Sequence, residues 1–365
     1  MRELLGTLDG WRAGGLDVGR AVVVRTFGSA PRPEGAVLLA ASDGRIAGSV
    51  SGGCVEGAAY EEVERARRDG VSRVIRYGIS DEQAWDVGLA CGGTIDVLVE
   101  PTIRPEIVDA GADIARGRAV ITPLPADSPG PAFGPHEPGA GAPPEPPLVV
   151  ADDGTLTGSL GEPELDAEVV RAGLAALASG TSRTVELAGR SLFVEAFPVR
   201  PRLVVVGAVQ VAIPLVAMAR ELGFETVVID GRAAFATPER FPTVDRLVVG
   251  WPDEVADEIG LGPADSVAVL THDVKFDEPA IVEALRRGCR YVGAVGSRKT
   301  QADRRARLAA AGVTAGELAR LRGPIGLDLG GRAPAETALA ILAEIVADRH
   351  GGSGRPMLDL VAASA

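Results

Sequence analysis

The pattern of apolar and polar positions changes near residue 200. Before that point, short apolar runs are interrupted by stripes such as Val55, Ala59, Val63 and Ala66, whose spacing predicts a helix. From Arg202 onward, continuous apolar runs alternate with longer amphipathic segments. Continuous apolar strands are typical of a parallel sheet that is covered on both faces. The change therefore predicts two domains of different architecture.

The first pattern predicts helices and strands in antiparallel arrangement, and the second predicts alternating strands and helices. The expected strands of the first half are 19–25, 36–41, 45–50, 72–77 and 94–100, with helices over 4–11 and from residue 54. The expected strands of the second half are 203–206, 225–229, 246–249, 266–270, 290–295 and 325–329. The expected helices there are 210–222, 253–259, 277–287, 298–311 and 334–348.

The first 200 residues contain an internal repeat. Asp153-Gly154 repeats Asp43-Gly44, and Gly158-Ser159-Leu160 repeats Gly48-Ser49-Val50, at one constant separation. A shared separation over many positions indicates duplication of one structural unit. We therefore predict an α/β chain: an N-terminal α+β domain of two tandem repeats, followed by a Rossmann-like doubly wound α/β domain.

The predicted boundaries follow from these patterns. The repeat domain spans 1–200, with copies at 1–101 and 102–200, and a proline-rich loop at 123–147 lies in the second copy. The Rossmann-like domain spans 201–350. A Gly/Ser-rich tail at 351–365 is expected to be flexible.

Cys54 is the first candidate for chemistry. It follows Ser51, Gly52 and Gly53 at the start of a predicted helix, where free N–H groups and the helix dipole favour a reactive thiol or a soft-metal ligand. The alternative is a small buried residue that fills a tight turn. The second copy has Glu164 in place of Cys54 and lacks the segment that carries Cys91. The fold therefore does not require either cysteine, which favours a functional role for both.

Composition narrows the classes of function. The chain has 365 residues, three cysteines and a formal net charge of −13. The negative charge argues against nucleic acid or an anionic membrane as the main partner. The start of the chain lacks a signal-peptide apolar region, and no apolar run is long enough for a membrane span. With so few cysteines, a reducing cytoplasm is the expected compartment.

The second domain carries candidate ligand-binding loops after its strands. Ligands bind beyond the carboxyl ends of such strands, where the chain places Gly207, Gln210, Asp230, His272, Asp273, Ser297 and Arg298. Val209 replaces the second glycine of the dinucleotide fingerprint and is expected to obstruct a pyrophosphate. The pattern thus predicts a Rossmann-like fold but argues against the binding of NAD(P). For His272, a capping or core histidine is an equal alternative.

These motifs together resemble the XdhC/CoxI family, the accessory factors of xanthine dehydrogenase and related molybdenum hydroxylases. The resembling segments are Gly28–Arg32, Gly48–Glu56, Cys91-Gly92-Gly93, Thr271-His272-Asp273, Gly296-Ser297-Arg298 and Gly326-Leu327-Asp328. The family usually has Gly-Ala-Gly-His-Val-Ala at the nucleotide loop, where this chain has Val209 and Gln210.

The resemblance implies a non-catalytic chaperone that binds molybdenum cofactor transiently and delivers it to an apo molybdenum hydroxylase. The resemblance also implies that the protein forms a homodimer, and it suggests a cysteine desulfurase as a further partner. The residues that we expect to contact the cofactor include Arg32, Ser51, Gly52, Gly53, Cys54, Glu56, Cys91, Gly92 and Gly93, with Cys54 and Cys91 near the metal. We expect the cofactor to bind in a cleft between the two domains.

Three classes of function remain open at this stage. The first is the cofactor carrier, the second is an NAD(P)-dependent oxidoreductase, and the third is a thiol-redox or sulfur-carrying protein that uses Cys54 and Cys91. The hydroxylase itself is excluded, because three cysteines cannot build the four-cysteine iron–sulfur sites of such enzymes.

Overall fold

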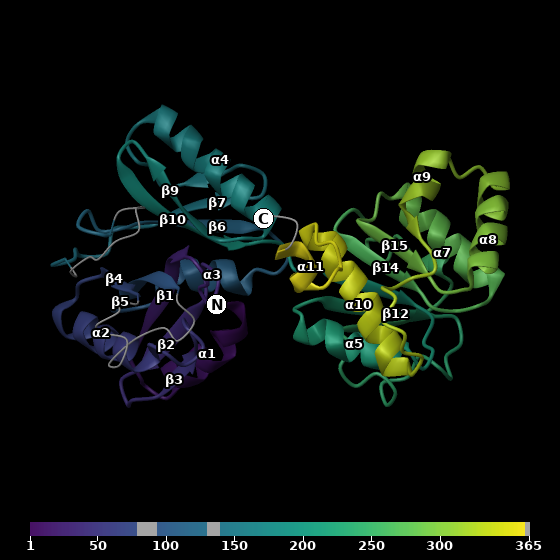
Figure 1. Ribbon diagram of the computed structural model, residues 1–365, viewed down its shortest axis with the longest axis horizontal. Coiled ribbons are helices and arrows are strands. Elements are labelled where there is room, and N and C mark those ends of the chain that lie inside the picture. Colours follow the sequence, from purple (N-terminus) through teal and green to yellow (C-terminus); the bar gives the residue numbers. More distant parts are fainter. Residues whose placement is uncertain (79–92, 130–138, 362–365) are drawn as a thin grey trace. The chain divides into compact units, whose positions relative to one another are not determined.

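The computed structural model describes residues 1–78, 93–129 and 139–361 (Figure 1). The chain divides into two compact units, Met1–Val199 and Arg200–Ala365. Within the described residues, no helix combines the length and the apolar character that crossing a membrane requires.

The first unit contains two copies of one structural motif. The first copy comprises η1 (Arg2–Leu4), α1 (Leu5–Ala13), β1 (Val18–Phe27), β2 (Val37–Ala41), β3 (Ile46–Gly48), α2 (Glu56–Asp69), β4 (Arg73–Tyr77) and β5 (Thr94–Glu100). The second comprises α3 (Pro105–Ala112), β6 (Arg118–Pro123), β7 (Leu148–Ala151), β8 (Leu156–Thr157), α4 (Pro163–Ser179), β9 (Arg183–Leu187) and β10 (Arg190–Phe197). Their antiparallel sheets have the orders β3-β2-β1-β5-β4 and β8-β7-β6-β10-β9, which are the same order in the two copies.

Alternating side chains of the central strands supply two different cores. In β1, Ala21 and Val23 pack in the core under α2, whereas Val22 and Val24 pack in a core that also contains residues of the second copy, such as Phe193. This is the period-2 alternation of a strand buried on both faces. A corresponding core lies under α4, which Figure 1 shows lying across the second sheet.

A buried ion-pair network joins the two copies. Arg20 is fully buried; its Nε donates to Glu100 at 2.5 Å and its Nη1 donates to Glu195 at 2.9 Å. Arg25 of the same strand donates to the Pro129 carbonyl and to Glu186. Buried charges need such partners, so these contacts specify how the two copies pair.

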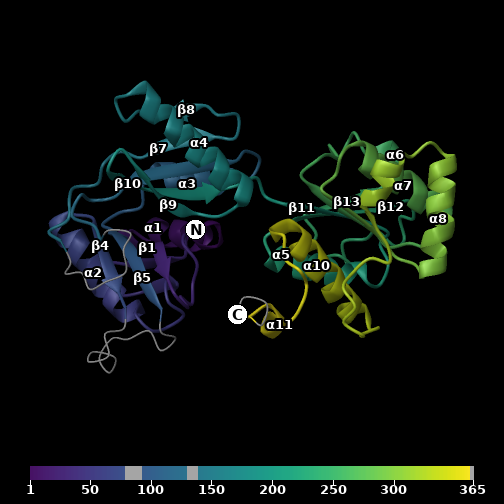
Figure 2. The same cartoon turned by 45° about the horizontal axis from the view of Figure 1, so that its top comes forward.

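The second unit is a doubly wound parallel sheet (Figure 2). Its strands are β11 (Arg202–Val206), β12 (Glu225–Asp230), β13 (Arg246–Val249), β14 (Asp265–Val269), β15 (Tyr291–Ala294) and β16 (Leu321–Arg322), in the order β13-β12-β11-β14-β15-β16. Its helices are α5 (Ala212–Glu221), α6 (Pro252–Val255), α7 (Val274–Arg286), α8 (Arg298–Ala310), α9 (Ala315–Arg320), α10 (Pro334–His350) and α11 (Met357–Val361). This is the Rossmann strand order, and the predicted fold class is confirmed.

Both faces of this sheet are covered. Val204 and Val206 of β11 pack in one core together with residues of α7 and α8, and Leu203 and Val205 pack in the other together with α5 and α10. The continuous apolar run that predicted this strand therefore reflects burial on two sides.

Several predicted elements differ from the structure. The last strand is 321–322 and not 325–329, because Pro324 cannot donate to a ladder; beyond it, Ile325 makes a single bond to the Ala294 carbonyl. The helix predicted at 253–259 is shorter in the structure, where α6 spans only Pro252–Val255. Within the expected flexible tail, residues 357–361 form α11.

Candidate functional site

One carboxylate holds the loop that precedes α2. Glu56 Oε1 accepts hydrogen bonds from the Ser49 hydroxyl at 2.5 Å and from the Ser51 N–H at 2.9 Å. Its Oε2 accepts from the Ser51 hydroxyl at 2.6 Å and from the Gly53 N–H at 2.9 Å. The predicted cofactor ligand Glu56 thus directs both oxygens into its own loop.

Hydrogen bonds also hold the two residues that directly precede this helix. The Ser51 hydroxyl oxygen accepts from the N–H groups of Cys54 and Val55, both at 2.9 Å. Helix α2 begins at Glu56, so Cys54 lies before the first turn and not within it. These bonds fix the loop before the helix, whereas the N-cap residue Val55 makes no side-chain cap hydrogen bond, so the role predicted for the N–H groups of the first turn stays a prediction.

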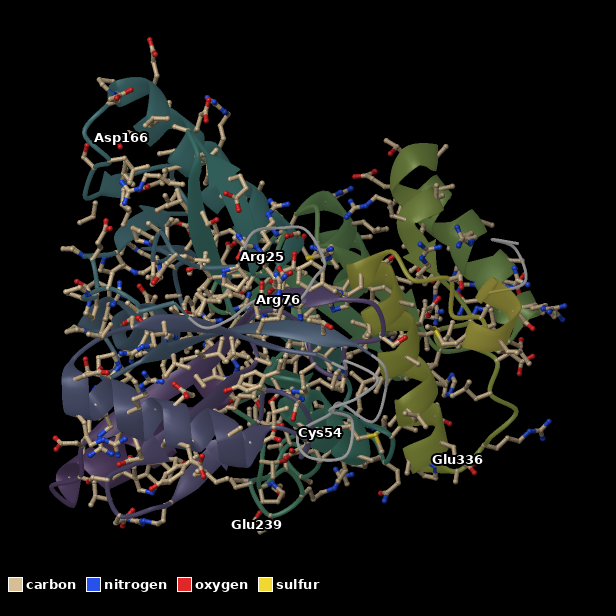
Figure 3. The ribbon with its side chains drawn as sticks, turned by 60° about the vertical axis from the view of Figure 1, so that its left-hand side comes forward. Arg25, Cys54, Arg76, Asp166, Glu239 and Glu336 are labelled. Carbon is tan, nitrogen blue, oxygen red and sulfur yellow. The ribbon has the colours of Figure 1, made fainter. Side chains whose placement is uncertain are left out.

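The same loop carries Cys54, which Figure 3 labels. The cysteine is exposed and free. Gly52 and Gly53 have φ angles of 80° and 118°, and a Cβ added at either would meet nothing within 4 Å. The positive φ angles therefore favour glycine at both positions, next to the exposed thiol.

The second copy builds the same carboxylate contact without the thiol. Asp166, which Figure 3 labels, accepts from the Ser159 hydroxyl at 2.6 Å and from the Leu160 N–H at 2.7 Å. Asp166 corresponds to Glu56, and Ser159 corresponds to Ser49. The carboxylate is therefore a structural feature of the repeat and not specific to the copy with the cysteine.

The two copies differ in where the helix begins. Helix α4 begins at Pro163, which corresponds to Gly53, whereas α2 begins three positions later at Glu56. Both helices end at corresponding glycines, Gly70 and Gly180, with φ angles of 72° and 67°. Residues 53–55, which include Cys54, are therefore not helical, whereas the corresponding residues 163–165 of the second copy are.

The hydrogen bonds also set the charge of the two carboxylates. Burial acts to raise the pKa of Glu56, but the hydrogen bonds from Ser49 and Ser51 outweigh it and lower the pKa to about 2. The hydrogen bond from Ser159 lowers the pKa of Asp166 as well. Both groups are therefore ionised at neutral pH.

The remaining predicted residues of this unit fall into two groups. Cys91 and Gly92 lie outside the described residues. A Cβ at Gly93 would come within 2.7 Å of the Ala30 nitrogen and of the Ser29 carbonyl carbon, so Gly93 packs against the loop that carries the exposed Arg32. Sequence reasoning proposed both motifs but could not detect that they are adjacent.

The second unit has a cavity of about 640 Å³ beyond the carboxyl ends of its strands. Among the predicted residues, Asp230, His272 and Asp273 line it together with Val209. The other lining residues are Gly231, Arg232, Trp251, Leu270, Thr271, Val274, Lys275 and Phe276. Sequence reasoning missed Trp251 and Lys275, although Trp251 lies only two residues after the predicted strand 246–249.

Asp230 is fully occupied within the protein. Its Oδ1 accepts from the N–H and Nε of Arg232, and its Oδ2 accepts from Arg232 Nη2 and the Ala208 N–H, all at 2.8–2.9 Å. Burial opposes ionisation, but the hydrogen bonds from Arg232 and Ala208 lower the pKa of Asp230. The four donors use its four acceptor positions, which leaves none for a ribose hydroxyl.

The three residues of the Thr271-His272-Asp273 motif have different contacts. Asp273 caps α7 by accepting from the Lys275 N–H at 3.0 Å. The Thr271 hydroxyl donates to buried Asp277, which also accepts from Arg304 at 2.9 Å. His272 is exposed on the cavity wall, so the core interpretation of this histidine is wrong.

Other predicted loop residues have local structural explanations. Gly207 has a φ of 109°, and a Cβ there would lie 2.4 Å from Thr271 Cγ2, so close packing of two loops requires the glycine. Ser297 caps α8 by accepting from the Thr300 N–H. Gln210 and Arg298 are exposed and do not line the cavity.

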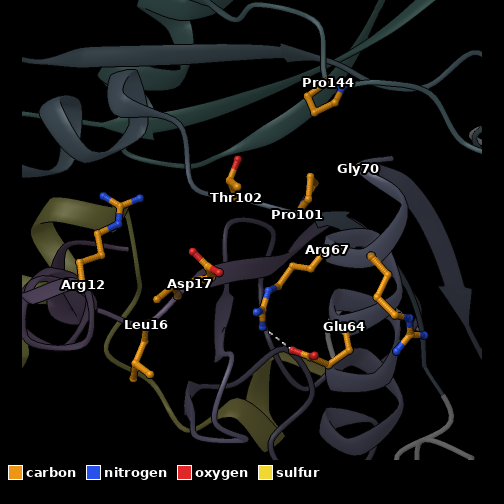
Figure 4. Close-up of a pocket in the computed structure, with 11 residues that line it drawn as sticks. Arg12, Leu16, Asp17, Glu64, Arg67, Gly70, Pro101, Thr102 and Pro144 are labelled. Atoms are coloured by element: carbon orange, nitrogen blue, oxygen red, sulfur yellow. Dashed lines mark hydrogen bonds and ion pairs between the residues drawn. The ribbon is translucent and has the colours of Figure 1, made fainter. Parts of the chain in front are cut away.

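A second cavity of about 740 Å³ lies in the repeat unit (Figure 4). Arg12, Arg67 and Arg68 line it, but Arg12 donates to the Ile103 carbonyl and Arg67 pairs with Glu64 at 2.5 Å. None of the residues predicted from the sequence lines this cavity.

Among residues 1–78, 93–129 and 139–361, no three His, Cys, Asp or Glu side chains gather as a metal-ion site.

Comparisons with known proteins agree with these motifs. A model of the XdhC Rossmann domain matches residues 203–345, and a model of the XdhC and CoxI family matches residues 11–78 and 141–188. Together the two models cover more than half of the chain.

Two relatives extend the comparison. A probable xanthine dehydrogenase subunit of Bacillus subtilis (strain 168) is 27% identical over 334 residues, which cover 90% of this chain and 92% of that protein. The molybdenum cofactor insertion chaperone PaoD of Escherichia coli (strain K12) is 44% identical over 78 residues, which cover 21% of this chain and 24% of PaoD.

A solved structure shares the fold. The crystal structure of a protein described as a xanthine dehydrogenase from Bacillus halodurans superimposes with a TM-score of 0.75 at 24% identity, and covers 96% of each chain. At this identity the likeness supports the fold alone.

Proposed function

Because the chain belongs to the XdhC and CoxI family, we propose that it is an accessory factor that binds molybdenum cofactor and delivers it to an apo molybdenum hydroxylase. The names of its relatives support this role, since one is a probable xanthine dehydrogenase subunit and another a molybdenum cofactor insertion chaperone. The proposed partner is a hydroxylase of the xanthine dehydrogenase type, and the proposed compartment is the cytoplasm.

The observation that carries this proposal is the loop before α2. The repeat can begin its helix at Pro163, yet the first copy keeps Gly53, Cys54 and Val55 outside the helix. Glu56 and Ser51 fix this loop with hydrogen bonds, and the thiol is free and exposed. An exposed thiol in a loop held by hydrogen bonds is accessible to a bound cargo, which favours a binding role over a packing role.

The chemistry of the thiol suits the proposed cargo. Molybdenum cofactor holds its metal through sulfur, and thiolates are suitable ligands for soft metal centres. Cys54 would contact the cofactor, and Glu56 would position the loop without touching the cargo. Cys91 remains a proposed second contact, and Gly93 places the end of its motif against the loop of Arg32.

The structure makes the oxidoreductase alternative less favourable. The carboxylate of Asp230 has no acceptor position left for a ribose, and Val209 lines the cavity where the fingerprint would place glycine. A thiol-redox or sulfur-carrying role would also use Cys54 with Cys91. In that role the protein would carry electrons or sulfur and not molybdenum cofactor. A homodimer and a cysteine desulfurase as sulfur donor stay predictions.

Analysis of the purified protein tests the proposal. We expect molybdenum and pterin fluorescence to copurify with protein from a strain that makes molybdenum cofactor, and both to fall in Cys54→Ser. Protein that carries neither, but has two titratable neighbouring thiols, would favour the thiol-redox alternative. Bound nicotinamide would favour the oxidoreductase.

A further inference from the structure

The cavity of the second unit is lined by residues at the carboxyl ends of four strands. Val209 follows β11, Asp230 ends β12, Trp251 follows β13 and Thr271 follows β14. Its volume of about 640 Å³ is within the range of sites for small organic molecules. A cavity at this position is where open α/β sheets bind ligands.

An exposed aromatic ring forms part of the wall. Trp251 is 42% exposed, although its ring centroid lies only 5.4 Å from that of buried Phe276. The glycine at position 231 lies beside the indole and has no side chain that would cover it. An indole that packs on Phe276 and keeps an accessible surface provides a stacking surface for a flat heteroaromatic ring.

Two cations lie in the same wall. Arg232 uses Nε and Nη2 to bind Asp230, and its guanidinium carbon lies 4.0 Å from the Phe235 ring centroid. Within the described residues, Arg232 Nη1 and the Lys275 ammonium group make no hydrogen bond or ion pair. These donors are suited to a phosphate group.

The same wall disfavours a dinucleotide. The four acceptor positions of Asp230 are filled by Arg232 and the Ala208 N–H, so the carboxylate cannot recognise a ribose diol. Val209 occupies the fingerprint position at which a glycine would let a pyrophosphate approach.

We propose that this cavity binds a single nucleotide, with its base stacked on Trp251 and its phosphate against Arg232 and Lys275. The cavity belongs to Arg200–Ala365 and Cys54 belongs to Met1–Val199, so nucleotide binding and the carrier role can each fail independently of the other.

Tryptophan fluorescence of the full-length protein, titrated with AMP, CMP and GMP, tests this site. We expect saturable quenching by at least one of these nucleotides, which Trp251→Phe removes and which remains in the control Trp11→Phe, whose tryptophan is buried in the other unit. By calorimetry, Trp251→Ala should weaken the binding of that nucleotide by about tenfold, the size expected for one stacking contact.

Two further binding measurements test how the phosphate is recognised and whether a dinucleotide is excluded. Lys275→Gln should weaken binding of the nucleotide but not of its nucleoside, because only the nucleotide carries phosphate. NAD should bind more weakly than AMP, and Val209→Gly should reduce that difference. Absence of saturable binding by all three nucleotides, or equal nucleotide affinity in the wild type, Trp251→Ala and Lys275→Gln, would overturn the proposal.

Discussion

Cys54 and Cys289 have opposite surroundings. Cys54 is exposed in a loop, whereas Cys289 is fully buried between α7 and β15. Burial raises the pKa of the Cys289 thiol to about 12, so it stays protonated and unreactive at neutral pH. The two cysteines thus offer a matched pair for separating cargo binding from packing.

We predict that Cys54→Ser changes the free energy of unfolding by less than about 0.5 kcal/mol, as other exposed substitutions do, but weakens cofactor binding. Cys289→Ser should show the reverse, because it places a hydroxyl in the core and leaves the loop intact. Thermal denaturation and pterin fluorescence of the two variants provide the test. A large loss of stability in Cys54→Ser with normal cofactor binding would show that Cys54 is a packing residue.

Glu56 is predicted to act through the loop and not on the cargo. Glu56→Gln should lower the free energy of unfolding by about 1–2 kcal/mol, since the charged hydrogen bonds are lost from a partly exposed site. It should also weaken cofactor binding. The control is Asp166→Asn, which removes the corresponding contact from the copy without the thiol and should leave cofactor binding unchanged. Equal losses of binding in both variants would contradict this role.

The lowered pKa of Glu56 also predicts a pH dependence. Because the folded-state pKa is about 2 and the unfolded value is near 4.5, the stability from Glu56 is fully present above about pH 4.5. It is lost as the pH falls toward 2. Relative to the wild type, the stability deficit of Glu56→Gln should therefore shrink over this range in chemical denaturation. A constant deficit would contradict the role of the carboxylate charge.

At the scale of elements, the start of α2 is the feature that distinguishes the two copies. We predict that Ser51→Gly, Gly52→Glu and Gly53→Pro together convert this start to that of α4, since they reproduce Gly161, Glu162 and Pro163. The triple variant should fold and keep a titratable Cys54 thiol but lose cofactor binding. Thiol titration and pterin fluorescence would check both expectations. Normal cofactor binding would show that the presence of the thiol, and not its position, is sufficient.

The sequence was sufficient to predict most elements because their apolar patterns match their burial. The continuous run in β11 and the stripe in α2 are both buried as expected. The predicted beginning of α2 at residue 54 is two residues too early, since the loop before Glu56 is held by hydrogen bonds of Ser51 and Glu56 that no apolar pattern indicates. The sequence also located three residues of the cavity in the second unit, Asp230, His272 and Asp273, but did not indicate that Trp251 lies in the same wall, because the walls come from strand ends far apart in the sequence.

The role of Asp230 shows a related limit. Its position after a strand of the sheet predicted a ligand-binding residue, but Arg232 and Ala208 already donate to its carboxylate. A motif therefore identifies the position of a side chain, whereas its neighbours decide what that side chain is free to bind.

At the scale of the whole molecule, the two copies depend on Arg20 for their pairing. We predict that Arg20→Ala lowers the stability of the repeat unit by about 3–5 kcal/mol, because buried Glu195 loses its ion-pair partner and buried Glu100 keeps only Arg104. Arg190→Ala, which removes an exposed pair with Glu145, should cost less than about 1 kcal/mol. Chemical denaturation would compare the two variants, and equal losses would refute a special role for the buried network.

The central claim is that this protein supplies cofactor to a separate hydroxylase. A carrier must hold its cargo and release it to the partner, so loss of the carrier should affect the partner's cofactor content and not its synthesis. The most direct measurement is the molybdenum and pterin content of the hydroxylase purified from a strain that lacks this protein. Complementation with the wild type, Cys54→Ser and Cys289→Ser provides the matched comparison. We predict normal amounts of hydroxylase polypeptide that is poor in cofactor, restored by the wild type and Cys289→Ser but not by Cys54→Ser. Full cofactor content and full activity in the deletion strain would contradict the carrier role.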